Sequence, residues 1–241
     1  MGVGPGDTVW TSPITFAASA NSARYCGAEV DFVDIDPHTY NISLEALKSK
    51  LEDADKTGRL PKAVIAVHMC GQSCDMQTLR ELSRKYEFYI IEDAAHALGG
   101  RYKSQPVGSC TLSDIAVFSF HPVKAITTGE GGMAVTNNAE LAERMRLLRE
   151  HGIVRDPRSA HETHEPTRNI TEPEGGAWYY EQVELGYNYR MTEIQAALGL
   201  CQLHRLDGFV ARRRHLAERY DNLLADVPIT LPCRIPEADS A

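Results

Sequence analysis

The sequence predicts an α/β fold built on a mostly parallel sheet, with helices flanking it. Short apolar runs alternate with longer amphipathic stretches from residue 1 to about residue 150, the order typical of βαβ units. Some of those runs are apolar throughout, which is typical of strands buried on both faces. With 241 residues, 43% of them hydrophobic, the chain is long enough to bury a sizeable core.

Each predicted strand is a short run of apolar and β-branched residues. The first follows a glycine-rich turn, Gly2–Asp7, and the third, Ala63–Val67, is apolar at every position. The fourth ends against two carboxylates, Glu92 and Asp93. The predicted strands are Val9–Thr11, Val30–Val33, Ala63–Val67, Phe88–Ile91, Ile115–Phe120 and Met133–Val135.

The predicted helices carry apolar residues at helical spacing. Gly27 stands where a glycine ends the first helix, and Ser43 stands where a serine caps the second. In the fourth helix Leu141, Met145 and Leu148 are expected to face inward. The predicted helices are Phe16–Tyr25, Leu44–Leu51, Met76–Lys85, Ala139–Glu150, Thr192–Leu206 and Phe209–Leu224.

Charge and composition exclude several classes of protein. The formal net charge is −8 without a basic stripe, which argues against a nucleic-acid or anionic-membrane partner. No apolar run approaches the roughly 18 residues of a membrane span, and Met1–Trp10 lacks the features of a signal peptide. A cytoplasmic protein is therefore expected, and its six cysteines are expected to be free thiols.

No metal site is expected. Cys70 and Cys74 do not have the CxxC spacing of redox or zinc pairs. His161 and His164 are three residues apart, whereas the metalloprotease helix needs a spacing of four. They lie in a polar stretch, Ser159–Trp178, that is expected to be a surface loop.

Two strand ends carry residues suited to chemistry. In parallel sheets ligands bind beyond the carboxyl ends of the strands. Asp93 leaves one apolar strand, and Ser119 to Lys124 follow another, with the glycine-rich segment Thr127–Gly132 behind them. Taken singly, a loop lysine is usually a solvated charge, and an aspartate at a strand end is usually a turn former.

Taken together, these segments form a known combination of motifs. Asp93–His96, Phe118–Lys124 and Thr128–Gly132, with Gly4–Asp7 and Gly186–Met191, resemble the DegT/StrS family of sugar-nucleotide aminotransferases. The resemblance covers nearly the whole chain. It implies the large domain of the fold-type-I, aspartate aminotransferase-like transferases that use pyridoxal 5′-phosphate (PLP).

The resemblance also implies roles for cofactor-binding residues. Lys124 corresponds to the lysine that forms the Schiff base with PLP and transfers the proton. Asp93 corresponds to the carboxylate that pairs with the pyridine nitrogen and makes the ring an electron sink. His96 matches the contact to the phenolic oxygen, and Phe16 matches the aromatic side chain that stacks on the ring. Ser119 resembles a phosphate-binding hydroxyl.

Three further implications concern the partner subunit and the substrate. Asn188 matches a residue that reaches the phosphate of the neighbouring subunit, which implies a homodimer with shared active sites. His121 and Tyr187 flank the site and are candidates for contact with sugar or nucleotide. Arg190 is a candidate for binding a donor carboxylate or a phosphate, or for anchoring the helix that starts at Thr192.

Within the family, His121–Lys124 and the segment 178–188 resemble one branch in particular, the UDP-4-amino-4,6-dideoxy-N-acetyl-β-L-altrosamine transaminases of pseudaminic acid biosynthesis. The implied reaction moves the amino group of glutamate to C4 of a UDP-linked 4-keto-6-deoxy-N-acetylhexosamine. A perosamine-type aminotransferase acting on another nucleotide sugar is the alternative within the family. Lys124 argues against the branch that uses this fold for dehydration, because that branch carries His there.

Family members carry a segment before the position of Met1 and a smaller domain beyond that of Ala241. The expected organisation is therefore a PLP-binding large domain over residues 1–206, lacking its N-terminal part. Residues 207–241 are expected to begin a truncated C-terminal domain. A non-catalytic fragment is accordingly the alternative from another functional class.

Overall fold

The computed structural model describes residues 1–154 and 180–241. The chain forms two compact units, the first comprising residues 1–137 and 193–241 and the second residues 138–192. Most of the predicted polar loop, with His161 and His164, lies outside the described residues. Within the described ranges, no helix combines the length and apolar character needed to cross a membrane.

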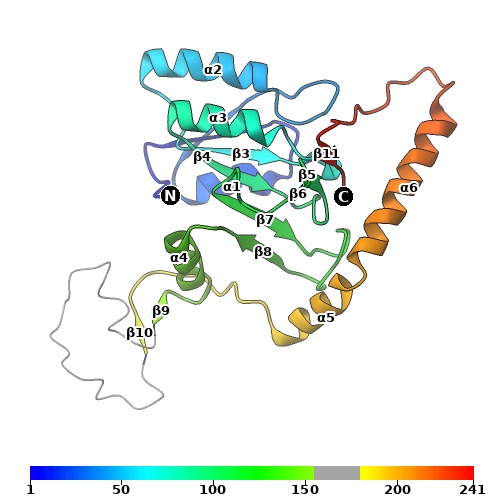
Figure 1. Ribbon diagram of the computed structural model, residues 1–241. Helices are drawn as coiled ribbons and strands as arrows, with labels where there is room; N and C mark the ends of the chain where they lie inside the picture. Colours follow the sequence, from blue (N-terminus) through cyan, green and yellow to red (C-terminus); the bar gives the residue numbers. More distant parts are fainter. Residues whose placement is uncertain (155–179) are drawn as a thin grey trace. The chain divides into compact units, whose positions relative to one another are not determined.

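A six-stranded sheet forms the centre of the first unit (Figure 1). Its order is β2-β1-β3-β4-β7-β8, and all neighbours are parallel except β8, which runs antiparallel to β7. This arrangement confirms the predicted α/β class with a mostly parallel sheet. The strands are β1 (Thr8–Thr11), β2 (Glu29–Phe32), β3 (Ala63–Val67), β4 (Tyr89–Asp93), β7 (Ile115–Ser119) and β8 (Gly132–Val135).

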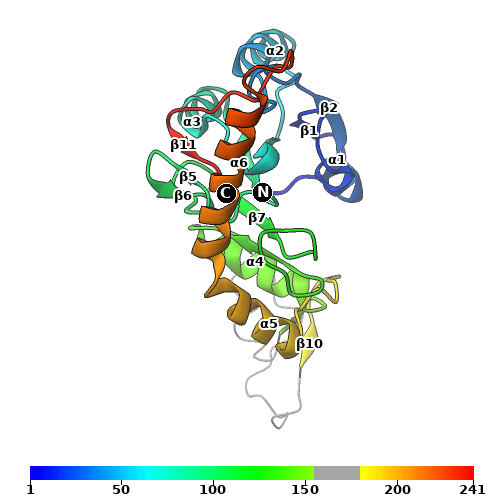
Figure 2. The ribbon, with the colours of Figure 1, turned by 90° about the vertical axis from the view of Figure 1, so that its right-hand side faces the viewer.

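Helices cover both faces of this sheet (Figure 2). On one face α2 (Leu44–Thr57) and α3 (Met76–Tyr86) bury Leu47 and Leu79 in a cluster with alternate strand residues such as Ile90. On the other face Ala23 of α1 (Ala17–Tyr25) packs with strand residues of the opposite alternation, including Ile65. Successive strand residues therefore point to two different cores, as a period of two requires.

Two observed helices are longer than predicted, because buried residues continue beyond the apolar pattern that is visible in the sequence. The second helix extends past Leu51 to Thr57 because Ala54 is still buried, and Gly58 ends it at φ 65°. The last helix, α6 (Leu206–Leu224), begins at Leu206 rather than Phe209, because Leu206 and Val210 are both buried. It follows α5 (Glu193–Leu203).

Several short elements of the first unit were not predicted. They comprise a single 3₁₀ turn and three two-residue strands forming a small sheet in the order β11-β5-β6. Two-residue strands have no periodicity for a sequence pattern to reveal. The elements are η1 (Met69–Gly71), β5 (Arg101–Tyr102), β6 (Gln105–Pro106) and β11 (Ala238–Asp239).

The second unit contains α4 (Ala139–Arg149) and an antiparallel pair, β9 (Ile153–Val154) with β10 (Glu181–Gln182). The predicted fourth helix is present, with Asn138 as its cap accepting from the Leu141 amide at 3.1 Å. Its three predicted inward residues are half-buried, and no residue of α4 is fully buried.

Candidate active site

Asp93 stands at the carboxyl end of β4, between two strands that run parallel to it. Its side chain lies on the face covered by α1, because Oδ2 accepts a hydrogen bond from Ser19 Oγ of that helix at 2.7 Å. Oδ1 accepts from the amide of Ala95 at 3.2 Å. The carboxylate is therefore held from two sides, and both donors are neutral.

Ser119 lies on the same face as Asp93. The register pairs Asp93 with Val117, and a residue two positions further along β7 points the same way. The Ser119 hydroxyl oxygen accepts from the His121 amide at 3.4 Å. Val117 is 39% exposed although it sits in an inner strand, so the sheet is open to solvent beside Asp93.

Lys124 lies in the loop that joins β7 to β8. The loop is closed at its base by Phe120, whose amide donates to Gly131 and whose carbonyl accepts from Thr128. Within it the Lys124 amide donates to the carbonyl of His121 at 3.0 Å. The lysine side chain is half-buried, and the loop departs from the same end of the sheet as Asp93.

His96 lies close enough to both Asp93 and Lys124 for their charges to change its pKa. Much of its surface is exposed, but the burial of the remainder lowers the pKa of the ring from 6.5. The positive charges of Lys124 and Arg213 lower this pKa further, while Asp93 raises it. The structure therefore brings Asp93, His96 and Lys124 into one neighbourhood, in which neutral imidazole is favoured at neutral pH.

Two other predicted residues of the first unit are more exposed. Phe16 is at the N-cap position of α1 and is 78% exposed. His121 is also exposed, with Nε2 3.9 Å from Glu130 Oε1 and Nδ1 accepting from the Val123 amide. Phe16 has no described contact with Asp93 or Lys124, and His121 contacts Lys124 only through its backbone carbonyl.

The remaining predicted residues belong to the second unit and are described within it. The ring of Tyr187 stacks on Tyr189, with centroids 4.8 Å apart. Arg190 donates to Glu150 Oε1 at 2.7 Å, and Asn188 forms an isolated bridge with Glu150. All three are exposed, and Arg190 is already engaged by a carboxylate.

Sequence reasoning missed two residues of this neighbourhood. Ser19 follows Phe16 by three positions, one helical turn, so a polar residue there could have been placed beside the strand ends. Arg213 follows Leu206 and Val210 on one face of α6, the face that packs on the loop after β4 at Gly99. Among the described residues, no group of three or more His, Cys, Asp or Glu side chains is placed to hold a metal ion.

The sequence pattern of the DegT/DnrJ/EryC1/StrS aminotransferase family matches residues 1–241. The chain belongs to this family of sugar aminotransferases.

Its relatives carry different names. It is 42% identical to the uncharacterized protein MJ1066 of Methanocaldococcus jannaschii over 89% of this chain and 51% of that one. It is 42% identical to a GDP-perosamine synthase of Caulobacter vibrioides over 93% of this chain and 53% of that one. It is 40% identical to the UDP-4-amino-4,6-dideoxy-N-acetyl-β-L-altrosamine transaminase of Campylobacter jejuni over 88% of this chain and 50% of that one. The chain thus spans about half the length of the curated relatives it matches.

Solved structures show the same architecture. A family member from Brucella abortus superimposes with a TM-score of 0.83 at 32% identity, over 99% of this chain and 58% of that one. The PLP-form of Spr1654 from Streptococcus pneumoniae gives a TM-score of 0.79 at 30% identity, over 99% and 59%. The family therefore includes proteins that hold PLP.

Proposed function

We propose that this chain is the cofactor-binding part of a PLP-dependent aminotransferase acting on a nucleotide-linked keto sugar. The observation that carries the proposal is the neighbourhood of Asp93, His96 and Lys124 at the carboxyl ends of β4 and β7. These are an acid, a neutral ring and a primary amine, which together with family membership point to PLP.

The residues present fit the chemical groups of PLP. Asp93 offers a carboxylate, held by neutral donors, to a protonated pyridine nitrogen. His96, whose ring is neutral, can donate or accept at the phenolic oxygen. Ser119 offers a hydroxyl to the phosphate, and Phe16 offers an exposed ring face for stacking. The exposed Val117 leaves an apolar floor beside Asp93.

Bound PLP would supply an electron sink for the electron pair left on a substrate carbon when its proton is removed. Asp93 would keep the proton on the pyridine nitrogen, since a carboxylate favours a cationic partner. Lys124 Nζ would hold the cofactor covalently and, as a free neutral amine, carry the proton to and from the substrate carbon. The net exchange is balanced: an amino group leaves glutamate as a carbonyl oxygen arrives, giving 2-oxoglutarate and an amino sugar.

The proposed acceptor is a UDP-linked 4-keto-6-deoxy-N-acetylhexosamine, aminated at C4. The support is the His121–Lys124 motif and 40% identity to the Campylobacter transaminase. A second candidate, a GDP-linked keto sugar, is favoured by 42% identity to the Caulobacter perosamine synthase. Assays of the full-length protein with a panel of UDP-, GDP- and dTDP-linked keto sugars would separate the two.

We further propose a homodimer in which Asn188 serves the phosphate site of the partner, with Tyr187, His121 and Arg190 near the substrate. The support is the resemblance of residues 186–191 to the family motif and the exposure of Asn188. Residues 1–206 are proposed as the PLP-binding large domain and residues 207–241 as the start of a smaller one. These assignments are tested by dimer-dependent cofactor binding and by variants of Asn188.

The test of cofactor binding is a titration with PLP followed by the visible absorbance of the lysine-bound cofactor. We expect the band in the unaltered chain and its loss in Lys124→Ala. Lys103→Ala is the matched control, because Lys103 is an exposed loop lysine above the ring of Tyr102. An unaltered chain without the band, or a Lys124→Ala variant that keeps it, would contradict the proposal.

A further inference from the structure

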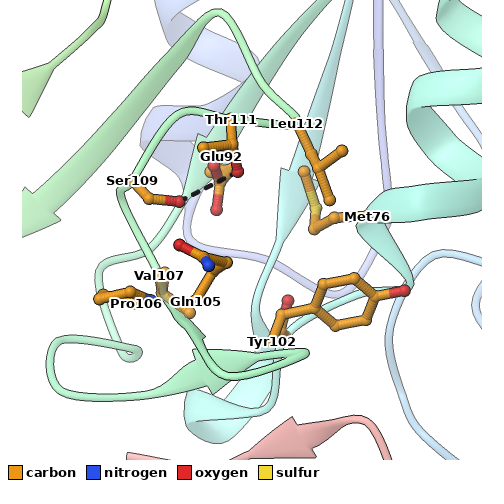
Figure 3. A pocket seen from close by; sticks show the side chains of 10 residues that line it. Met76, Glu92, Tyr102, Gln105, Pro106, Val107, Ser109, Thr111 and Leu112 are labelled. Carbon is orange, nitrogen blue, oxygen red and sulfur yellow. Dashed lines mark hydrogen bonds between the residues drawn. The ribbon is translucent and has the colours of Figure 1, made fainter.

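Glu92 and Asp93, the last two residues of β4, point to opposite faces of the sheet. Asp93 faces α1, whereas Glu92 faces the core formed by α2 and α3. There Glu92 lines a small pocket with Met76, Tyr102 and Leu112 (Figure 3). The proposed cofactor chemistry uses Asp93 and leaves Glu92 without a role.

The Glu92 carboxylate is buried, with the residue only 5% exposed, yet it is supplied with donors. His68 Nε2 lies 2.8 Å from Oε2, the Ser113 hydroxyl donates to Oε1, and the backbone of Gly108 also hydrogen-bonds to it. Burial alone would raise the pKa of Glu92, but the hydrogen bonds from His68 and Ser113 hold this pKa below its ordinary value. The side chain is therefore a buried carboxylate that these donors keep ionised.

The His68 ring is oriented by its other nitrogen. The Cys74 amide donates to Nδ1 at 3.2 Å, so the ring proton sits on Nε2 and points at Glu92. Burial lowers the pKa of this fully buried ring, whereas the hydrogen bonds with Cys74 and Glu92 raise it. In addition, the backbone amide of His68 donates to the backbone carbonyl of Asp93 at 3.1 Å. The residue that binds Glu92 is therefore also hydrogen-bonded to the backbone of Asp93.

The three donors come from three different segments. His68 follows β3, Gly108 follows β6, and Ser113 precedes β7. Because β3 and β7 are the two neighbours of β4, one carboxylate joins the end of β4 to the connections on both sides. A buried charge generally costs more stability than an apolar residue of the same size. The advantage of Glu92 at this position is therefore the geometry that it imposes on the end of β4.

We propose that Glu92, with His68 and Ser113, is a positioning residue that fixes the end of β4 from behind the sheet and so aims Asp93 at the cofactor. This inference rests on the proposed function, because it assigns Asp93 to the pyridine nitrogen. Glu92 does not touch cofactor or substrate and acts only through the strand it holds. Small displacements of such a carboxylate weaken binding strongly, because hydrogen bonds depend steeply on geometry.

The test compares Ser113→Ala and Glu92→Gln with Ser83→Ala. Ser113→Ala removes one donor to Glu92, and Glu92→Gln keeps the shape but replaces one acceptor oxygen by a donor. Ser83→Ala is the matched control, because Ser83 is also a buried serine with one hydrogen bond, to Phe88 at the opposite end of β4. All three variants are expected to lower the melting temperature.

Only the first two variants are expected to weaken PLP binding, by about tenfold, and to shift the pH midpoint of the cofactor absorbance. Hydrogen exchange at the His68 amide, which needs no cofactor, is expected to become about tenfold faster in Ser113→Ala and to stay unchanged in Ser83→Ala. If Ser113→Ala and Glu92→Gln match Ser83→Ala in affinity, absorbance and exchange, the positioning role is overturned. An unaltered chain that never binds PLP overturns the proposed function and this inference with it.

Discussion

At the scale of single residues, the candidate site depends on how Asp93 is held. A sequence motif can identify this carboxylate, but it cannot show that Ser19 supplies one of its hydrogen bonds at 2.7 Å. Ser19 is itself buried and lies 2.8 Å from the Thr15 hydroxyl. A short polar chain thus runs from the start of α1 to the carboxylate.

Ser19→Ala is expected to weaken PLP binding by roughly tenfold or more, the scale of one hydrogen bond to a charged group, whereas Ser19→Thr keeps the hydroxyl. Titration with PLP, followed by absorbance, measures the change. Ser22→Ala is the control, because Ser22 is an exposed serine of the same helix that donates to a backbone carbonyl. Equal affinities for Ser19→Ala and the unaltered chain would show that Asp93 needs no such donor.

The lowered pKa of His96 gives a prediction for its titration. The imidazole should titrate below 6.5 in the folded chain, with a higher midpoint in Lys124→Ala and a lower one in Asp93→Asn. Between the folded value and 6.5 the unfolded chain binds more protons, so folding becomes less favourable as the pH falls through this window. NMR of the ring protons measures the midpoints. If the midpoint of His96 is unchanged in both variants, His96 does not interact with Asp93 and Lys124 and is not part of the site.

At the scale of elements, β5 is held by the start of α3. Asp75 caps this helix by accepting from the Thr78 amide at 3.2 Å, and it also accepts from the hydroxyl of Tyr102, a buried residue of β5. A two-residue strand has too few ladder bonds to persist alone, so this side-chain contact accounts for its place.

Tyr102→Phe is expected to lower the free energy of unfolding by about 1–2 kcal/mol, because it removes the hydroxyl that donates to Asp75. Burial raises the pKa of Asp75, but the hydrogen bonds from Thr78 and Tyr102 lower it by more, so the net pKa is below 3.8. The stabilisation is therefore present at neutral pH and lost as the pH falls below 3.8 through the folded value. Urea unfolding measures it, with the partly exposed Tyr89 changed to Phe as control.

At the scale of the whole molecule, α5 is an apolar helix with no buried residue. Its exposed side chains include Ile194 at 84% and Leu200 at 61%. A helix that exposes this many large apolar side chains is typical of an interface. In the proposed homodimer, a second copy of the chain would cover this surface.

The paired change Ile194→Glu and Leu200→Glu is expected to convert a dimer into a monomer, because charges would have to be buried in the interface. Sedimentation velocity measures the association, and circular dichroism checks that the fold is kept. Tyr25→Glu is the control, since Tyr25 is 80% exposed at the end of α1. A dimer that survives the double change would place the interface elsewhere.

Sequence patterns predicted the long elements well because each has a repeating reason to form. Ala63–Val67 is apolar at every position, and Ser43 marks the start of α2. The end of α2 was placed too early because Ala54, although buried, is too small to continue a visible pattern. The strands β5, β6 and β11 have no periodicity, and only tertiary contacts create them.

By itself, the sequence determined the α/β class and the candidates Asp93 and Lys124, because both follow from local patterns and motif order. The tertiary structure decided which residues act on those candidates from a distance. Ser19 is 74 residues from Asp93, and His68 is 24 residues from Glu92, and only folding brings such pairs into contact. The side of the sheet that a strand residue faces is fixed by packing, which is why Glu92 and Asp93, adjacent in sequence, have different surroundings.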